Sequence, residues 1–157
     1  MPSKKLKEFL DQKKIKYITI KHSSAFTAQE IAAAAHIPGK ELAKSVIIKA
    51  DGKMAIAVLP ASYKVNFDQL KKVLKAKEVR LAYEQEFMDK FPDCEIGAMP
   101  PFGNLYGMEV YAAESLSGDE EIAFNACSHT ELIKMKFKDF LKLVKPKIIK
   151  FSAQSKV

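Results

Sequence analysis

The stretch Cys94-Glu-Ile-Gly-Ala-Met-Pro-Pro-Phe-Gly-Asn-Leu-Tyr-Gly-Met-Glu-Val110 is the most irregular part of the chain. Three glycines and two adjacent prolines fall within eleven of its residues. Proline fixes φ and removes an N–H, whereas glycine permits positive φ and lets a ligand approach the backbone. Interleaved apolar residues can fix such a segment to a core. The pattern predicts a stiff loop, which forms either one wall of a small-ligand site or an ordinary long surface loop.

The composition is typical of a single globular domain. The chain has 157 residues, of which 48% are hydrophobic and 29% are charged. No apolar run approaches the ~20 residues of a membrane span, and the N-terminus lacks the apolar segment of a signal peptide. We therefore expect one cytoplasmic domain over residues 1–157 without membrane contact, with a frayed tail over residues 148–157.

The net charge of +7 is concentrated at the two ends of the chain. Residues 1–22 hold seven lysines against two acidic residues, and residues 134–157 hold eight against one, while the segment between them is net acidic. If both ends lie on one side of the fold, they form a patch suited to phosphates. The alternative is that they are solvated, lysine-rich surfaces.

Hydrophobic periodicity and turn residues predict a mixture of helices and strands without regular alternation. This pattern favours an α+β fold with a mixed, curled sheet over a doubly wound parallel sheet. Asp51-Gly52, between two apolar runs, is the strongest hairpin signal. The predicted helices cover residues 3–14, 27–36, 66–74, 83–91 and 137–144. The predicted strands cover residues 15–21, 44–50, 54–59, 79–82, 108–112, 122–125 and 131–135.

Lys44 is a first candidate for chemistry because it begins an apolar strand. If its side chain points inward, the ammonium must find an anion or a carbonyl, since an unpaired buried charge is costly. If the side chain points outward, it is an ordinary lysine at a strand end.

The segment Phe124-Asn-Ala-Cys-Ser-His-Thr130 is a second candidate. Its small residues, hydroxyls and backbone N–H groups suit an oxyanion or phosphate nest. Cys127 and His129 could form a nucleophilic pair, although residues two apart on a strand rarely reach the necessary hydrogen bond. The two cysteines make no disulfide framework, and the three histidines show no metal-site spacing.

Five blocks of sequence together resemble the YbaK family of aminoacyl-tRNA deacylases, which is related to the editing domain inserted in bacterial prolyl-tRNA synthetases. The order and spacing of the blocks are specific, and the match runs from about Leu6 to Pro146. The resemblance implies a mixed sheet curled into a partly closed barrel with flanking helices. The blocks are His22-Ser-Ser-Ala-Phe-Thr-Ala-Gln-Glu-Ile-Ala32, Ala43-Lys-Ser-Val-Ile-Ile-Lys-Ala-Asp-Gly52, Ala57-Val-Leu-Pro-Ala61, Ile96-Gly-Ala-Met-Pro-Pro-Phe-Gly103 and Phe124-Asn-Ala-Cys-Ser-His-Thr-Glu-Leu-Ile133.

The resemblance also implies hydrolysis of the ester that links a wrong amino acid to the 3′ end of a tRNA, without a cofactor or metal. The expected partners are that aminoacyl-tRNA end and, as an open alternative, an aminoacyl-tRNA synthetase. The implied site comprises a near-invariant lysine, a glycine–proline loop, a small-residue loop and a side-chain pocket. The lysine falls on Lys44, and the glycine–proline loop falls on Gly97, Pro100, Pro101 and Gly103. The small-residue loop falls on Ala126, Cys127 and Ser128, and the side-chain pocket on Phe26, Thr27 and Met99.

We expect the Lys44 ammonium to bind the 3′-terminal phosphate or ribose oxygens and to face a small cavity between the two loops. Backbone N–H groups of both loops would polarise the ester carbonyl, and one such donor is typically worth ~2.7–4 kcal/mol. Water would then attack, with a ribose hydroxyl assisting rather than a protein base.

One departure from the family concerns Cys127, where many relatives carry glycine. If that position requires positive φ, cysteine is strained there, and its side chain narrows the pocket. Two other functions therefore stay open. One is a non-catalytic module of the same fold that binds tRNA or a synthetase, and the other is a thiol hydrolase that uses Cys127 and His129.

Overall fold

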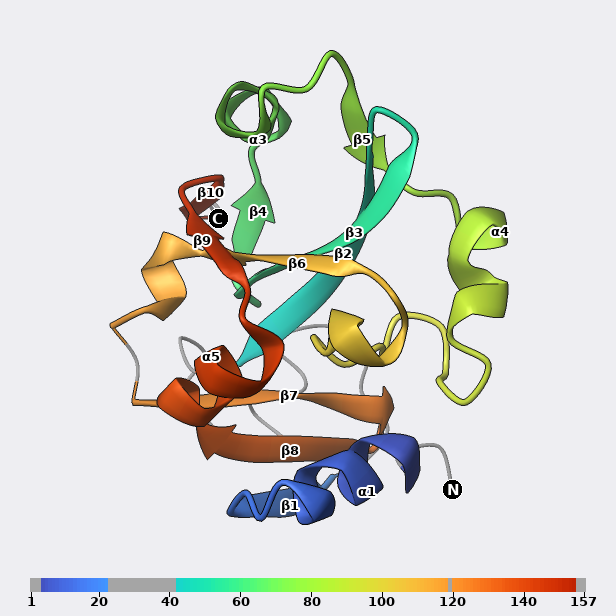
Figure 1. Cartoon of the computed structure of the whole chain (residues 1–157), viewed down its shortest axis with the longest axis vertical. Coiled ribbons are helices and arrows are strands. Elements are labelled where there is room, and N and C mark those ends of the chain that lie inside the picture. Colours follow the sequence, from blue (N-terminus) through green and yellow to red (C-terminus); the bar gives the residue numbers. More distant parts are fainter. Residues whose placement is uncertain (1–3, 23–41, 119, 155–157) are drawn as a thin grey trace.

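The computed structural model describes residues 4–22, 42–118 and 120–154. Its strands form three sheets with helices around them (Figure 1). The five-stranded sheet has the order β5-β2-β3-β6-β9, the three-stranded sheet the order β1-β8-β7, and β10 pairs with β4. The elements are α1 (Lys4–Gln12), β1 (Tyr17–Lys21), β2 (Ala43–Ala50), β3 (Lys53–Pro60), β4 (Tyr63–Val65), α3 (Phe67–Leu74), β5 (Val79–Leu81), α4 (Glu84–Phe87), η1 (Met88–Lys90), η2 (Gly103–Leu105), β6 (Glu109–Ala113), η3 (Glu114–Leu116), β7 (Glu121–Ser128), β8 (Glu131–Lys136), α5 (Phe137–Val144), β9 (Lys147–Ile149) and β10 (Ser152–Gln154).

The five-stranded sheet is mixed. Its β2–β3 and β2–β5 pairs are antiparallel, whereas its β3–β6 and β6–β9 pairs are parallel. An isolated parallel bridge between Leu42 and Ala123 marks one point where the chain before β2 meets β7 of the three-stranded sheet. The α+β class is therefore confirmed. A partly closed, barrel-like sheet is not, because the described strands form three separate sheets.

The hairpin that begins the five-stranded sheet forms where the sequence predicts it. Asp51 and Gly52 both adopt positive φ, 49° and 84°, which matches the twist of the flanking strands. The Asp51 carboxylate also accepts hydrogen bonds from the backbone N–H groups of Lys77 and Glu78, at 3.0 and 2.9 Å. One turn residue therefore fixes both the hairpin and the segment leading into β5.

The core consists of two clusters on opposite faces of the five-stranded sheet. Successive side chains of a strand point to opposite faces, and along β3 Ile56 and Val58 belong to one cluster while Ala57 and Leu59 belong to the other. The first cluster includes residues of α1, β7, β8 and α5, and the second includes residues of α3 and β6 together with Phe151. The face on which a residue lies thus decides its neighbours.

The C-terminal segment differs from the expectation of a frayed tail over residues 148–157. Residues 147–149 pair with β6, and residues 152–154 pair with β4. Between them Phe151 is fully buried, and its carbonyl oxygen accepts a 2.6 Å hydrogen bond from the backbone N–H of Asn66. Burial of one aromatic side chain and pairing of two short strands stabilise a segment that has little periodicity of its own.

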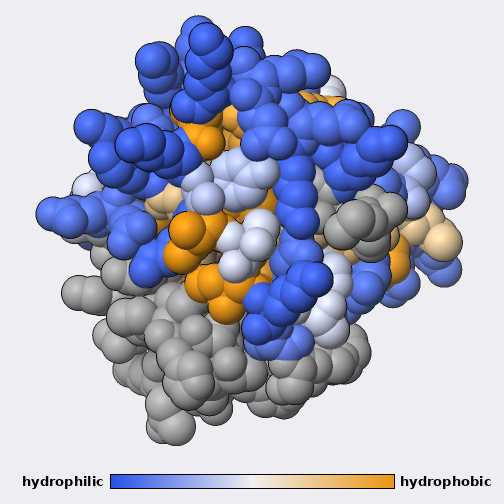
Figure 2. Space-filling view, turned by 90° about the horizontal axis from the view of Figure 1, so that it is seen from below, coloured by the Kyte–Doolittle hydropathy of each residue, from blue (hydrophilic) through white to orange (hydrophobic). Residues whose placement is uncertain are grey.

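The basic ends of the chain lie only partly together. In Figure 1, α1 and β1 occupy the lower end of the molecule and β8 and α5 the same half, while β9 and β10 lie in the upper half. Seen from below, hydrophilic residues cover most of the described surface (Figure 2). The described N-terminal lysines therefore lie in the same half of the molecule as those of β8 and α5, whereas β9 and β10 lie in the other half.

Candidate functional site

The end of β7 carries a β-bulge. Asn125 lies opposite Leu132 and Ser128 opposite Glu131, so Ala126 and Cys127 have no partner residues across the β7–β8 ladder. Cys127 has a φ of 65°, and a non-glycine residue in this left-handed region costs about 1–2 kcal/mol. The backbone at Cys127 is therefore one that glycine would adopt without strain, whereas cysteine is strained there.

The Gly/Pro loop, residues 94–107, is docked onto this bulge by three hydrogen bonds. The backbone N–H of Glu95 donates to the carbonyl oxygen of Cys127 at 2.9 Å, and the N–H of His129 donates to the Glu95 carboxylate at 3.2 Å. The Nε2 atom of His129 lies 2.8 Å from the carbonyl oxygen of Ile96. A carbonyl can only accept, so this ring nitrogen carries the proton. The two small-residue loops of the predicted site thus lie side by side.

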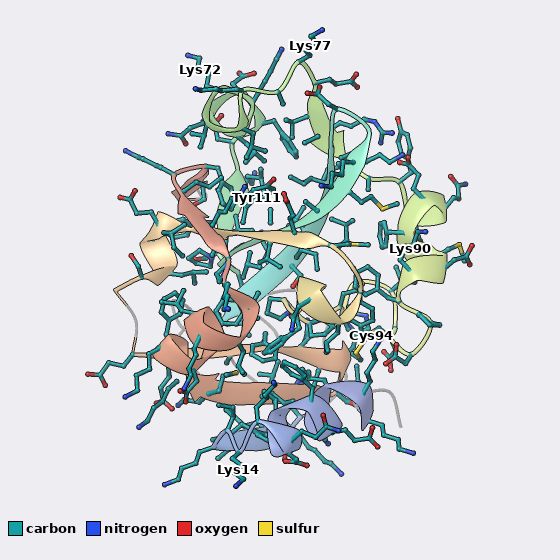
Figure 3. All side chains as sticks on the ribbon, viewed as in Figure 1. Lys14, Lys72, Lys77, Lys90, Cys94 and Tyr111 are labelled. Carbon is teal, nitrogen blue, oxygen red and sulfur yellow. A yellow bond between two sulfur atoms is a disulfide. The ribbon has the colours of Figure 1, made fainter. Side chains whose placement is uncertain are left out.

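A disulfide between Cys94 and Cys127 joins the same two segments. Figure 3 shows the sulfur of Cys94 close to the carboxyl end of β7. No local pattern in the sequence indicates this bond, because the two residues are 33 apart and only the docking of the loop brings them together. With Cys127 in a disulfide and the His129 ring directed at Ile96, the structure gives no support to a Cys127–His129 nucleophilic pair.

The Cys94–Cys127 pair has one acidic neighbour. Ligand atoms of Asp93, Cys94 and Cys127 all lie within 4.8 Å of one another, a grouping that could hold a metal ion. Both sulfurs are bonded to each other here, however, and a metal would require them as thiolates.

The remainder of the Gly/Pro loop is fixed to the first core cluster. Met99 and Phe102 belong to that cluster, and Pro100, Pro101 and Gly103 are buried. A Cβ atom on Gly103 would lie 2.7 Å from Cγ2 of Val110 and still closer to the carbonyl oxygen of Met108, so only glycine fits there without a shift. These residues form the base of the loop rather than its accessible surface.

Two backbone donors of the predicted oxyanion site are already engaged. The N–H of Ala98 donates to the carbonyl oxygen of Glu95 at 3.0 Å, and the N–H of Gly97 lies 3.2 Å from the Met99 sulfur. Thioether sulfur is a weak acceptor, and Gly97 is exposed. Of these two donors, the N–H of Gly97 is therefore the one that can most easily exchange its acceptor for the carbonyl oxygen of a substrate.

Lys44 lies on the other face of the five-stranded sheet from Met99 and Ala126. Alternation along β2 places it with Val46 and Ile48, which pack in the second cluster, whereas Met99 and Ala126 belong to the first. The Lys44 side chain therefore does not lie between the two loops, contrary to the expectation from the sequence.

The Lys44 ammonium is nevertheless suited to an anion. Its side chain is half-buried, and burial, followed by the nearby charge of Lys64, lowers its pKa. Within the described part of the chain it makes no ion pair or hydrogen bond. A desolvated cation beside a second cation attracts an anionic ligand.

Asn125, within the predicted small-residue segment, is a further polar residue beside the bulge. The parallel bridge joins Leu42 to Ala123, and Lys44 and Asn125 each follow it by two residues. They therefore lie on the same side, next to the bulge. The Asn125 Oδ1 atom is buried and accepts no hydrogen bond from the described residues. A buried oxygen without a donor is unusual in a folded protein and marks a place for a ligand donor.

The other predicted residues divide into two groups. Ser128 is partly buried, and its hydroxyl bonds to the Thr130 hydroxyl and N–H at 2.9 and 3.1 Å, so it stabilises the β7–β8 turn. Phe26 and Thr27 lie outside the described residues, as does the predicted helix over residues 27–36.

A hollow of about 770 Å³ lies at a different place. It is bordered by the start of β7 and by α5, and none of the described residues of the predicted site lines it. Across residues 4–22, 42–118 and 120–154, no helix has the length and apolar character needed to span a membrane.

Comparisons with known proteins agree with the resemblance in the sequence. The model of a family described as "Aminoacyl-tRNA editing domain" matches residues 22–143. Proline–tRNA ligases of Bacillus mycoides (strain KBAB4) and Bacillus cereus (strain AH187) are each 27% identical to the chain over 100 residues. These regions cover 64% of the chain and 17% of each ligase, so the chain spans less than a fifth of the length of these curated relatives.

Solved structures share the fold. A crystal structure of a candidate trans-editing enzyme for prolyl-tRNA synthetase superposes with a TM-score of 0.84 at 17% identity, over 97% of both chains. A hypothetical protein superposes with a TM-score of 0.85 at 17% identity, over 96% of this chain and all of the other. At this level of identity the likeness shows the fold alone.

Proposed function

The chain belongs to the aminoacyl-tRNA editing domain family, and from this membership we propose that it hydrolyses the ester bond of a mischarged aminoacyl-tRNA. Its substrate is then the 3′ end of a tRNA carrying a wrong amino acid, and its products are the free amino acid and the tRNA. Editing of this kind serves fidelity, because one methylene gives a binding pocket only ~1–3 kcal/mol of discrimination.

The observation that carries the proposal is the docking of the Gly/Pro loop onto the β7 bulge. The hydrogen bonds of Glu95 to Cys127 and of His129 to Ile96 hold an exposed glycine N–H beside residues that have no ladder partner. Donors fixed in this way stabilise the oxyanion of an ester hydrolysis without having to reorganise. The ester is activated, so water assisted by a ribose hydroxyl suffices as the nucleophile.

Lys44 and Asn125 support the binding of the nucleotide end. The ammonium, which has no anion in the described part of the chain, takes a phosphate or ribose oxygen of the acceptor end. The unpaired Oδ1 of Asn125 accepts a hydrogen bond from a hydroxyl or from the α-amino group. In this arrangement Lys44 positions the nucleotide from beside the bulge rather than from between the two loops.

The test is a deacylation panel of tRNAs charged with small amino acids, including alanine, serine and cysteine. Wild type is compared with Lys44→Ala and with Lys53→Ala, a control lysine on β3 whose side chain is 76% exposed. We expect Lys44→Ala to lower kcat/KM by ~10²-fold, the cost typical of a lost positioning contact, and Lys53→Ala to leave it unchanged. Equal turnover by a folded Lys44→Ala variant would contradict the role of Lys44, and hydrolysis of no charged tRNA would contradict the enzymatic function.

A non-catalytic module of the same fold is the second candidate. Two observations keep it open, namely Cys127 at positive φ and the two loop N–H groups that are already engaged. It predicts tRNA binding without deacylation, and binding that weakens with salt at a slope of about −0.7 per phosphate neutralised on a single strand. A filter-binding salt series beside the deacylation panel separates the two functions.

A further inference from the structure

The disulfide joins one accessible and one inaccessible sulfur. Cys94 is partly exposed, whereas Cys127 is fully buried at the bulge. A small thiol or disulfide in solution can therefore reach Cys94 first, and Cys127 can react only with the sulfur of Cys94. Pairs of one accessible and one resolving cysteine are typical of reversible redox sites.

We propose that Cys94 and Cys127 form a reversible thiol-modification site, in which Cys94 exchanges with low-molecular-weight disulfides and the bond to Cys127 controls the geometry of the neighbouring site. The control of activity rests on the proposed deacylase function. The exchange chemistry itself does not.

The oxidation proceeds in two balanced steps. The Cys94 thiolate attacks one sulfur of a disulfide such as oxidised glutathione, which forms a mixed disulfide and releases one glutathione thiolate. The Cys127 thiolate then attacks the Cys94 sulfur, which closes the protein disulfide and releases the second glutathione. The two protein thiols lose two protons and two electrons, and two reduced glutathione molecules carry these away.

The surroundings of the pair suit such exchange. The Tyr106 hydroxyl lies 3.5 Å from the Cys94 sulfur and 3.8 Å from the Cys127 sulfur. Burial and the nearby charge of Asp93 raise the pKa of Tyr106, so its hydroxyl stays protonated and can donate to either thiolate. The Asp93 carboxylate acts in the opposite sense, because a negative charge disfavours the thiolate. The Tyr106 hydroxyl and the Asp93 carboxylate therefore influence the rate of exchange in opposite directions.

Breaking the bond alters the site at its bulge. Reduction removes the covalent link between the Gly/Pro loop and the bulge, while the hydrogen bonds of Glu95 and His129 keep the loop attached. Without the disulfide, the backbone N–H donors of the Gly/Pro loop are held less rigidly. The oxidised protein is therefore the faster catalyst.

The test uses the full chain, reduced with dithiothreitol or oxidised with excess oxidised glutathione and then freed of small thiols. Mass spectrometry after N-ethylmaleimide treatment counts the free thiols, and single-turnover deacylation measures activity. We expect two adducts after reduction and none after oxidation. We also expect kcat to be ~10-fold lower in the reduced protein, because the backbone donors are then held less rigidly beside the ester carbonyl.

Variants identify which sulfur reacts with solution. Cys94→Ser should match reduced wild type and become insensitive to oxidant, because the buried Cys127 alone gains little glutathione. Cys127→Ser should accumulate one glutathione adduct at Cys94. Adding Asp93→Asn to this variant should speed formation of the adduct, because it removes a negative charge that disfavours the Cys94 thiolate. Because wild type is compared in both states, the result does not depend on whether a variant folds.

Three outcomes would overturn the proposal. Two N-ethylmaleimide adducts after oxidation would show that no bond forms, and equal kcat in both states would show that the bond controls nothing. Uptake of one Zn²⁺ per reduced chain, with protection of both thiols from oxidation, would identify a metal site instead. If neither state deacylates any charged tRNA, the proposed function fails, while the thiol counts still decide the exchange chemistry.

Discussion

Lys44 lies directly opposite Leu59 in the antiparallel β2–β3 ladder. Leu59 is fully buried in the second core cluster, so the aliphatic part of Lys44 begins at the edge of an apolar layer. Its ammonium ends beside Lys64 without an anion in the described part of the chain. This arrangement costs stability in the free protein and is useful only if a ligand supplies the missing charge.

The first prediction concerns Lys44→Met, which keeps the aliphatic length and removes the charge. Burial and then Lys64 lower the pKa of Lys44, so between that pKa and 10.5 the unfolded chain binds more protons than the folded chain. Stability of the wild type therefore rises with pH across this window. We expect the variant to be more stable at neutral pH and its advantage to shrink as the pH rises towards 10.5.

Urea midpoints at neutral and alkaline pH measure this difference. Lys53→Met is the matched control, and its effect should stay within the ±0.5 kcal/mol usual for exposed positions. A destabilised Lys44→Met at neutral pH would mean that the ammonium is compensated by a partner.

The second prediction separates the backbone of Cys127 from its sulfur. Cys127→Gly and Cys127→Ala both remove the disulfide, but only glycine tolerates the φ of 65° without strain. We expect Cys127→Gly to be more stable than Cys127→Ala by about 1 kcal/mol, measured by chemical denaturation under reducing conditions. Equal stability would indicate that the bulge relaxes once the sulfur is absent. Retained deacylation by Cys127→Gly would also exclude a thiol nucleophile.

The third prediction tests the close packing of Gly103. A Cβ at this residue would overlap Val110 and the backbone of Met108, and overpacking of a buried site typically costs about 1–3 kcal/mol. Gly118 has ordinary φ and nothing within 4 Å of an added Cβ, so Gly118→Ala is the matched control and should be neutral. Thermal unfolding of both variants checks the difference, and a neutral Gly103→Ala would show that the Gly/Pro loop can shift without cost.

The fourth prediction concerns Glu86, which joins α4 to the five-stranded sheet. Its carboxylate accepts hydrogen bonds from Arg80 at 2.8 and 3.0 Å and pairs with Lys49 at 2.6 Å. Hydrogen bonds from Arg80, Lys49 and the Tyr83 backbone hold the pKa of Glu86 far below 4.5. Its contribution is therefore complete above pH 4.5 and is lost as the pH falls below that value.

Glu86→Gln should accordingly destabilise the protein at neutral pH and differ less from wild type at about pH 3. Glu84→Gln, at an exposed position in the same helix, serves as the control and should show neither effect. Urea midpoints at both pH values give the comparison. A gap between Glu86→Gln and wild type that does not change with pH would assign the effect to packing rather than charge.

Local signals in the sequence determined much of the secondary structure. Asp51-Gly52 forms the predicted hairpin, Asn66 caps α3 through the N–H of Gln69 at 3.0 Å, and α5 spans the predicted residues 137–144. Each depends on residues within a few positions of one another, which periodicity and capping rules describe. The order of the five blocks likewise determined the family.

Only the tertiary structure decided the arrangement of the site. The Cys94–Cys127 bond, the face on which Lys44 lies and the strands β9 and β10 depend on contacts between residues far apart in the chain. No local pattern encodes such contacts, because a three-residue strand forms when its partner is present and a lysine at a strand end suits either face. The sequence by itself determined most of the described helices and strands and the family, whereas packing of the Gly/Pro loop onto the β7 bulge determined which groups meet.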